Sequence, residues 1–406
     1  MTTTHVSRPQ GGTPPVYATA TQFRQAAQLL AAGKGPIALD AERASSFRYG
    51  ERAFLIQAHR AGTGTILIAP EADRAACSAA LAPVLNGHTW VLHSAHNDLP
   101  CLKMLGLEPG DLIDTEIAAL MLHEPRTGLG ALVEANLNIV LEKAHSNEDW
   151  SRTPLPRDWL DYAALDVEYL LPLAEIFCTD LKEEGKLEYF QQECAFIVAE
   201  AAHAPTEEKA WNQLKGAHAL TTATSQRVAA ALDAFRHSEG AATDTSVQKI
   251  LPNKALIAAA LRPPSSIRQL RQLPLGRRIP GTYLPRLLDT IAAAKAATGR
   301  PPRVEKNHRA HDTHHALSSN RWRDDDTLID TWDKVRDTVE TIAEEMTIDR
   351  RCLPNNATLK AVTMTIVDAP ADTANMENLI RDSLQQQQAR PWQIDALAEP
   401  LAALAK

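Results

Sequence analysis

Several features that mark secreted and membrane proteins are scarce in this sequence or missing from it. The five cysteines among 406 residues are scattered and include no C-x-x-C pair, which argues against a disulfide framework or a cysteine zinc site. No apolar run approaches the roughly 20 residues that cross a bilayer. Residues 1–17 lack the charged and apolar regions of a signal peptide and are predicted to be a flexible tail. We expect a cytoplasmic protein with no membrane partner.

Charge is distributed unevenly along the chain, whose net charge is −8. Residues 1–204 carry 15 Lys and Arg against 26 Asp and Glu, a net of −11. Residues 205–302 carry 14 against 6, a net of +8, and residues 303–406 carry 13 against 18, a net of −5. A basic module tends to meet phosphates. An acidic site that acts on phosphates usually holds metal ions, so the acidic first part is the candidate for chemistry.

The first half of the chain has the pattern of an α/β domain, which we place at residues 1–204. Three consecutive strand-like segments are followed by alternating helices and strands, and this order predicts a mixed sheet. From residue 130 onward the pattern is helical, and residues 156–190 are predicted to form one long helix or a broken one. The predicted strands lie at residues 36–42, 52–60, 62–70, 88–95 and 111–114.

The second half is predicted to consist of two all-helical modules, at residues 205–297 and 327–406. Residues 298–326 between them are polar and contain proline, which is typical of a linker. We interpret the four histidines of this linker as solvated, because no acidic or cysteine partners surround them. The segment "KILPNKALIAAA" resembles "RCLPNNATLKAV" 102 residues later, which favours two related modules of which the second has diverged.

Two carboxylates stand at the end of the strand predicted at residues 36–42. Asp40 and Glu42 are two positions apart in "PIALDAE", and alternation along a strand points both to the same side. Two like charges at the end of a buried strand are costly unless a cation pairs with them. The alternative is a strand end that opens to solvent, where two acids are harmless.

Further acids and one tyrosine occur in the same domain. Asp98 lies where a predicted strand gives way to a helix, and the alternative for it is a helix-capping role. Asp114 stands in a similar place, and we assign it the capping role. In "DYAALDVEYL", Tyr162 and Asp166 are four residues apart and share one helix face. The alternative for this pair is a tyrosine in a core contact and a solvated aspartate.

In this order, the motifs resemble the DEDD family of 3′→5′ exonucleases, which have an RNase H-like fold. The D-x-E of "LDAE", the aspartate of "HSAHNDL" and the Y-x-x-x-D of "YAALD" match its three motifs. The surrounding sequence is similar to the ribonuclease D family, and residues 209–296 are similar to the HRDC domain. The resemblance covers residues 35–296, and residues 327–406 look like the second, degenerate HRDC-like domain of that family. Ala41 stands where many relatives have threonine.

The resemblance implies a metal-dependent hydrolase. Asp40, Glu42, Asp98 and Asp166 would hold two divalent cations, Mg²⁺ or Mn²⁺, which prefer oxygen ligands. Tyr162 completes the implied catalytic set. Its hydroxyl would hydrogen-bond the attacking water, since a phenol with a pKa of about 10 is a poor base by itself.

The implied activity is a 3′→5′ exoribonuclease that releases 5′-mononucleotides, with tRNA precursors and other small stable RNAs as substrates. The first alternative is a DNA 3′→5′ exonuclease, because the motifs are shared and sugar choice depends on 2′-OH contacts. The second is a non-catalytic nucleic-acid-binding protein, which usually has an incomplete carboxylate set. We expect a monomer. The predicted contacts to nucleic acid in the basic module are Lys249, Lys254, Arg268, Arg271, Arg277 and Arg278.

Overall fold

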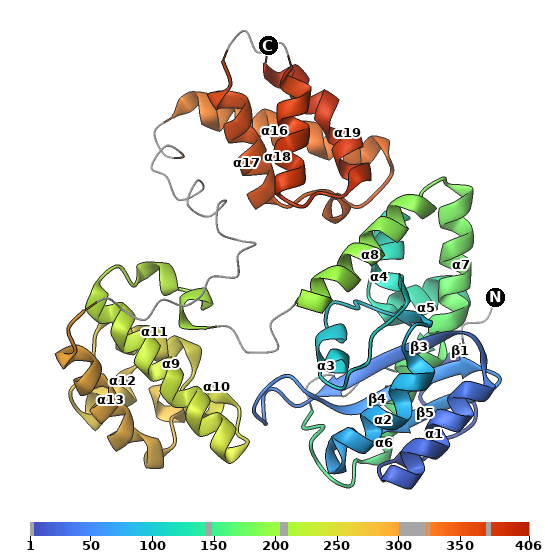
Figure 1. Ribbon diagram of the computed structural model, residues 1–406, viewed down its shortest axis with the longest axis horizontal. Coiled ribbons are helices and arrows are strands. Elements are labelled where there is room, and N and C mark those ends of the chain that lie inside the picture. The colour runs from blue at the N-terminus through green and yellow to red at the C-terminus, as the bar shows by residue number, and fades with distance from the viewer. Residues whose placement is uncertain are drawn as a thin grey trace.

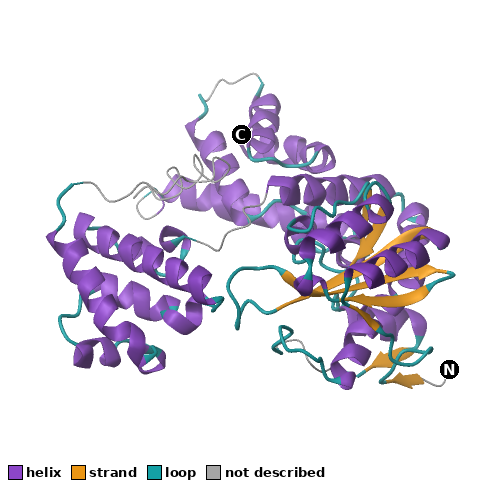
Figure 2. Cartoon of the chain, turned by 60° about the horizontal axis from the view of Figure 1, so that its bottom comes forward, coloured by secondary structure: helices purple, strands orange, loops and turns teal. Residues whose placement is uncertain are grey.

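The computed structural model describes residues 4–142, 148–203, 210–299, 322, 325–370 and 375–405. Figure 1 shows an α/β body in blue and green (within residues 4–203), a first helical module in yellow (210–299) and a second helical module in orange and red (325–405). In Figure 2 the strands are grouped in the α/β body. An α/β domain followed by two helical modules is thus the observed secondary structure. Most of the predicted linker lies outside the described residues.

The α/β body is built on one mixed sheet of six strands. Its strands are β2 (Val16–Tyr17), β3 (Lys34–Arg43), β4 (Ala53–Ala61), β5 (Gly64–Ile68), β6 (Thr89–Leu92) and β7 (Asp111–Asp114). Their order is β2-β5-β4-β3-β6-β7. Strand β4 pairs antiparallel with both β3 and β5, whereas β6 and β7 continue the sheet parallel to β3. The carboxyl ends of β3, β6 and β7 therefore meet at one edge, where ligands of α/β proteins commonly bind.

Helices cover both faces of this sheet (Figure 1). They are α1 (Ala20–Ala32), α2 (Arg74–Leu85), α3 (Leu99–Lys103), α4 (Thr115–Met121), α5 (Leu129–Leu137), α6 (Arg157–Glu168), α7 (Leu170–Glu183) and α8 (Leu187–His203). The long helix predicted at residues 156–190 is thus broken into α6, α7 and the start of α8. The second break has a local cause, because Gly185 adopts φ 71° after α7, a conformation that glycine tolerates without strain.

Alternation along β3 decides what each face of the sheet carries. Ile37 and Leu39 belong to the core formed with α1 and α2. Ala38 points the other way, into a core shared with α6 and α7. Asp40 and Glu42 continue the series of Ala38, so both carboxylates lie on the face that α6 covers.

The second helical module packs against the α/β body through α8 and α4. Its helices are α16 (Asp326–Glu345), α17 (Asn356–Asp368), α18 (Met376–Gln386) and α19 (Pro391–Ala402). Glu193 on α8 is buried and accepts hydrogen bonds from Arg390 Nε at 2.7 Å and Trp392 Nε1 at 2.8 Å. The Lys186 ammonium bridges the bodies by donating to the carbonyls of Met121 and Thr347. The apolar cores of the two bodies are continuous.

The first helical module has its own core, and a loop of the α/β body contacts it. Its helices are α9 (Ala223–Thr243), α10 (Val247–Ile250), α11 (Asn253–Leu261), α12 (Ile267–Gln272) and α13 (Leu284–Ala296). Residues 44–52, between β3 and β4, reach this module. Arg52 pairs with Asp244 at 2.9 Å, and Lys249 Nζ lies 4.4 Å from the Phe47 ring centroid. The loop that begins beside the carboxylates therefore also carries the contact with the first helical module.

Three local expectations differ from the structure. Within the tail predicted to be flexible, β1 (Thr4–Val6) pairs with β8 (Ile139–Leu141), and β2 adds an edge strand to the main sheet. The short strand β8 was predicted as helix, since three residues give too little alternation to detect. The helix expected to begin near Asn97 is shorter than predicted and consists of α3 alone, because Gly106 ends the segment with φ 70°.

Candidate active site

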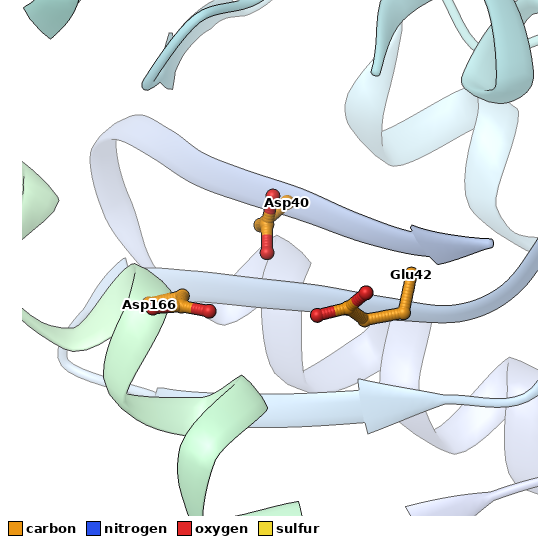
Figure 3. A group of neighbouring side chains, drawn as sticks. All are labelled: Asp40, Glu42 and Asp166. Carbon is orange, nitrogen blue, oxygen red and sulfur yellow. The ribbon is translucent and has the colours of Figure 1, made fainter. Parts of the chain in front are cut away.

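Three of the predicted carboxylates converge between β3 and α6. One oxygen each of Asp40, Glu42 and Asp166 lies within 4.8 Å of the others. Figure 3 shows the three side chains pointing toward one another, two from the strand and one from the helix. The strand brings Asp40 and Glu42 to one face, and the packing of α6 on β3 brings Asp166 over them. The fold therefore collects acids that are about 125 residues apart in sequence.

Asp98 joins the same group from the segment after β6. It is buried, and its side chain hydrogen-bonds that of Asp40. It occupies the N-cap position of α3 but its side chain makes no capping hydrogen bond. The capping alternative considered from the sequence is therefore wrong for Asp98, and its carboxyl group is directed at the other acids instead.

Burial is the main cause of the raised pKa values of these four carboxyl groups. It raises the pKa of Asp40 and raises the pKa values of Asp98 and Asp166 well above their ordinary value. The pKa of Glu42 is raised to about 10 by burial and by the neighbouring negative charges. Burial and mutual repulsion thus both disfavour negative charge on these four acids, and a cation bound among them would offset both effects.

Tyr162 lies beside this cluster, one helical turn before Asp166. The Tyr162 hydroxyl hydrogen-bonds the Asp166 carboxylate. Burial, with the charges of Asp166, Glu42 and Asp40, raises the pKa of Tyr162. A phenol with a raised pKa stays protonated, so Tyr162 is suited to orient a water molecule and not to act as a base.

Asp114 at the end of β7 braces the segment that carries Asp98. Its carboxylate is fully buried and accepts hydrogen bonds from the backbone N–H groups of Ser94 at 3.0 Å and Ala95 at 2.7 Å. It also caps α4 by accepting from Glu116 N at 2.9 Å, as the sequence predicted. Ser94 has φ 59°, a left-handed conformation that a non-glycine residue adopts at a cost of about 1 kcal/mol or more. We infer that Asp114 offsets this cost and so positions Asp98.

The residues of the cluster fit divalent cations. All the donors are carboxylate oxygens, the ligand type that Mg²⁺ and Mn²⁺ prefer. Gln57 stands opposite Asp40 on β4 and is completely buried. Within the described residues neither polar atom of its side chain has a hydrogen-bond partner. An unpaired buried amide is destabilising, so a polar ligand or water beside Asp40 would complete this part of the site.

The six basic residues predicted to contact nucleic acid differ in exposure and in the contacts that they make within the protein. Lys254, Arg268, Arg277 and Arg278 are exposed on the first helical module. Lys249 is exposed but lies over Phe47. Arg271 donates to the backbone carbonyls of Arg277 at 3.1 Å and Ile279 at 2.7 Å, so its guanidinium holds a loop together.

Comparisons with known proteins agree with this geometry. Residues 16–182 match the family model described as 3'-5' exonuclease, and residues 316–404 match the model described as 3' to 5' exonuclease C-terminal domain. The ribonuclease D of Gluconacetobacter diazotrophicus is 28% identical over 225 residues, which are 53% of this chain and 56% of that protein. The ribonuclease D of Escherichia coli is 29% identical over 189 residues, 46% of this chain and 50% of that protein. The chain is a relative of ribonuclease D.

Solved structures share the fold of this chain. A protein from Bifidobacterium adolescentis is 29% identical, with a TM-score of 0.80 and coverage of 99% of each chain. Escherichia coli RNase D is 21% identical, with a TM-score of 0.66, and the match covers 92% of this chain and 99% of that one. The second likeness shows a shared fold. In sequence, the matched segments are about half the length of the curated ribonuclease D relatives.

One feature of the site was missed from the sequence. Gln57 stands in "FLIQ", where a polar residue interrupts an apolar run, and that interruption was the available sign.

Proposed function

We propose that this protein is a hydrolytic 3′→5′ exoribonuclease that removes 5′-mononucleotides from RNA. The observation that carries the proposal is the convergence of Asp40, Glu42, Asp98 and Asp166, with Tyr162 hydrogen-bonded to Asp166. The relationship to ribonuclease D supports it. Escherichia coli RNase D is an exoribonuclease involved in structured RNA processing, which supports 3′ trimming of tRNA precursors and other stable RNAs as the role here.

Each residue of the cluster has a defined part in this proposal. Asp40, Glu42, Asp98 and Asp166 would hold two divalent cations, Mg²⁺ or Mn²⁺. When bound, such ions activate water and stabilise the negative charge that develops on a phosphate under attack. Tyr162 would orient the attacking water through its hydroxyl, with Asp166 fixing the orientation of the phenol. Asp114 would keep Asp98 in place.

We further propose that the two helical modules are HRDC-like and that the first one binds RNA upstream of the cleaved end. Its sequence carries a net charge of +8 over residues 205–302, and phosphate contacts make affinity dependent on salt. Lys254, Arg268, Arg277 and Arg278 are exposed candidates. Replacing these four by glutamine should weaken RNA binding and reduce its salt dependence. An unchanged affinity and salt slope would remove this role.

The domain limits 1–204, 205–297 and 327–406 stay part of the proposal, as does a monomeric state.

A labelled-substrate assay tests the activity. A 3′-extended tRNA and a matched DNA oligonucleotide, each labelled at the 5′ end, would be incubated with Mg²⁺ or with EDTA, using wild type and Asp98→Asn. We expect a ladder that shortens from the 3′ end on RNA, is lost with EDTA and is lost in the variant. Equal or faster shortening of DNA would indicate a DNA exonuclease. Binding without any ladder would indicate a non-catalytic nucleic-acid-binding protein.

A further inference from the structure

Gln57 on β4 is a buried polar side chain on the face of the sheet that holds the acids. It pairs with Asp40 of β3 on one side and with Leu67 of β5 on the other. Side chains of directly opposed residues in an antiparallel pair stand on the same face, so Gln57 and Asp40 share the face that α6 covers. Leu55, two positions before Gln57, belongs with Leu67 to the core beneath α6, which agrees with this placement.

The amide of Gln57 is surrounded by neighbours that do not bond it. The residue is completely buried, and among the described residues neither Nε2 nor Oε1 has a hydrogen-bond partner. Its neighbours Leu55 and Leu67 are apolar. The next residue of β4 on this face, His59, has its Nδ1 engaged with a threonine hydroxyl of β5 at 2.8 Å. Asp40 is the acid among the residues that flank Gln57 on this face.

An unpaired amide in this position destabilises the metal-free protein. Burying the group without a partner lowers the free energy of unfolding, whereas an apolar side chain of the same shape would not. A second buried glutamine shows the usual arrangement. Gln393 on α19 is also completely buried, but its Nε2 donates to Glu193 Oε1 at 3.2 Å and to the carbonyl of Cys352 at 2.6 Å. Gln57 therefore has the character of a residue whose partner is in place only when a ligand is bound.

We propose that Gln57 is a positioning residue for the metal-bound site, where its amide N–H group donates to the Asp40 carboxylate, directly or through one buried water. This inference rests on the proposed function and adds a residue to it. Carboxylates that bind metal ions are themselves commonly hydrogen-bonded, and this second bond fixes the orientation of the ligand. A neutral amide can supply the bond without repelling the cations, which an ammonium or a guanidinium group would do.

Two measurements should respond in opposite directions when the amide is removed. Gln57→Met keeps an unbranched side chain of similar length and deletes both polar atoms. Without metal, the variant no longer buries an unpaired amide, so its Tm should rise by about 1–4 °C. With metal, Asp40 lacks its donor, so the affinity for Mn²⁺ should fall by about 10-fold. A glutamine that only supports the fold would behave otherwise, because its loss would lower the Tm and leave the Mn²⁺ affinity unchanged.

Scanning calorimetry with a chelator and titration calorimetry with Mn²⁺, both on the full chain, test this without turnover. Wild type would be compared with Gln57→Met and Gln57→Leu, two apolar replacements of different shape, so that the result does not depend on how one side chain packs. Gln393→Met is the matched control, because it deletes a buried amide that has partners. We expect a lower Tm and an unchanged Mn²⁺ affinity in this control. Asp166→Asn identifies the Mn²⁺ binding that belongs to the four acids.

The outcomes separate this inference from the function on which it rests. Equal Mn²⁺ affinity in wild type and both Gln57 variants would overturn the inference while leaving the exonuclease intact. A lower Tm of both variants in chelator would also overturn it, because the amide would then be satisfied in the metal-free protein. If wild type binds no Mn²⁺, or if Asp166→Asn binds it as wild type does, the proposed function is contradicted and the inference falls with it.

Discussion

Replacing Glu42 by glutamine should stabilise the metal-free protein while impairing metal binding. Burial and the charges of Asp40, Asp166 and Asp98 raise the pKa of Glu42 to about 10. In the unfolded chain a glutamate ionises near pH 4.3. Between these two values the folded protein keeps a proton that the unfolded chain has released. The free energy of unfolding therefore falls as the pH rises above about 4.3, and the loss continues up to the raised pKa.

The size of the effect follows from the same numbers. Each pH unit in this interval removes about 1.4 kcal/mol from the free energy of unfolding. At pH 7.5 the ceiling for Glu42 is about 4 kcal/mol. The four carboxyl groups titrate together, so we expect glutamine to recover about 1–3 kcal/mol at pH 7.5 and less than about 1 kcal/mol at pH 5. For a chain of 406 residues this corresponds to a rise in Tm of roughly 1–4 °C at pH 7.5.

Scanning calorimetry in the presence of a chelator measures this difference. Wild type, Glu42→Gln and the control Glu175→Gln would be compared at pH 5.0 and 7.5, since Glu175 is exposed on α7. We expect the Tm gain of Glu42→Gln to grow with pH and the control to match wild type. Added Mg²⁺ should raise the Tm of wild type far more than that of Glu42→Gln. A Glu42→Gln protein that is no more stable than wild type at pH 7.5 would refute the reasoning.

Three further substitutions have expected outcomes. Tyr162→Phe should lower turnover by about 100-fold and leave Mn²⁺ affinity unchanged, and unchanged turnover would remove its role in orienting water. Asp114→Asn should lower the free energy of unfolding by about 2 kcal/mol and raise the Mg²⁺ concentration needed for half-maximal activity; a Mg²⁺ requirement equal to that of wild type would show that Asp98 does not depend on this brace. Asp244→Ala should increase hydrogen exchange in residues 44–52, because Arg48 and Arg52 each lose an ion pair with Asp244, and unchanged exchange would contradict the contact.

The part of the fold predicted best from the sequence is the part with strong local patterns. Apolar runs before Asp40, within β4 and within β5 predicted three strands of the sheet within a few residues. The two-residue spacing of Asp40 and Glu42 was enough to place both on one face. Short elements were harder, because β1 and β8 are three residues long and owe their existence to pairing with each other.

The site was predicted only where its residues follow local rules. Asp98 could be selected by resemblance to the family motifs. Its side chain bonds Asp40 and makes no capping hydrogen bond, and no local sequence pattern reveals that Asp40 lies beside it. The bulge at Phe54 on β4 was not predicted either, because a bulge depends on the register with the partner strand. The structural role of Arg271 likewise depends on how the loop after α12 folds back. Such features arise from tertiary packing and register, which periodicity in one segment does not encode.

The central claim is that Asp40, Glu42, Asp98 and Asp166 form one centre for divalent cations. Anomalous diffraction from crystals of wild type and Asp166→Asn grown with Mn²⁺ tests it most directly. We predict two Mn²⁺ peaks among these four carboxylates in wild type and the loss of at least one in the variant. Peaks elsewhere in the molecule, or none beside these acids at a Mn²⁺ concentration that supports activity, would contradict the account.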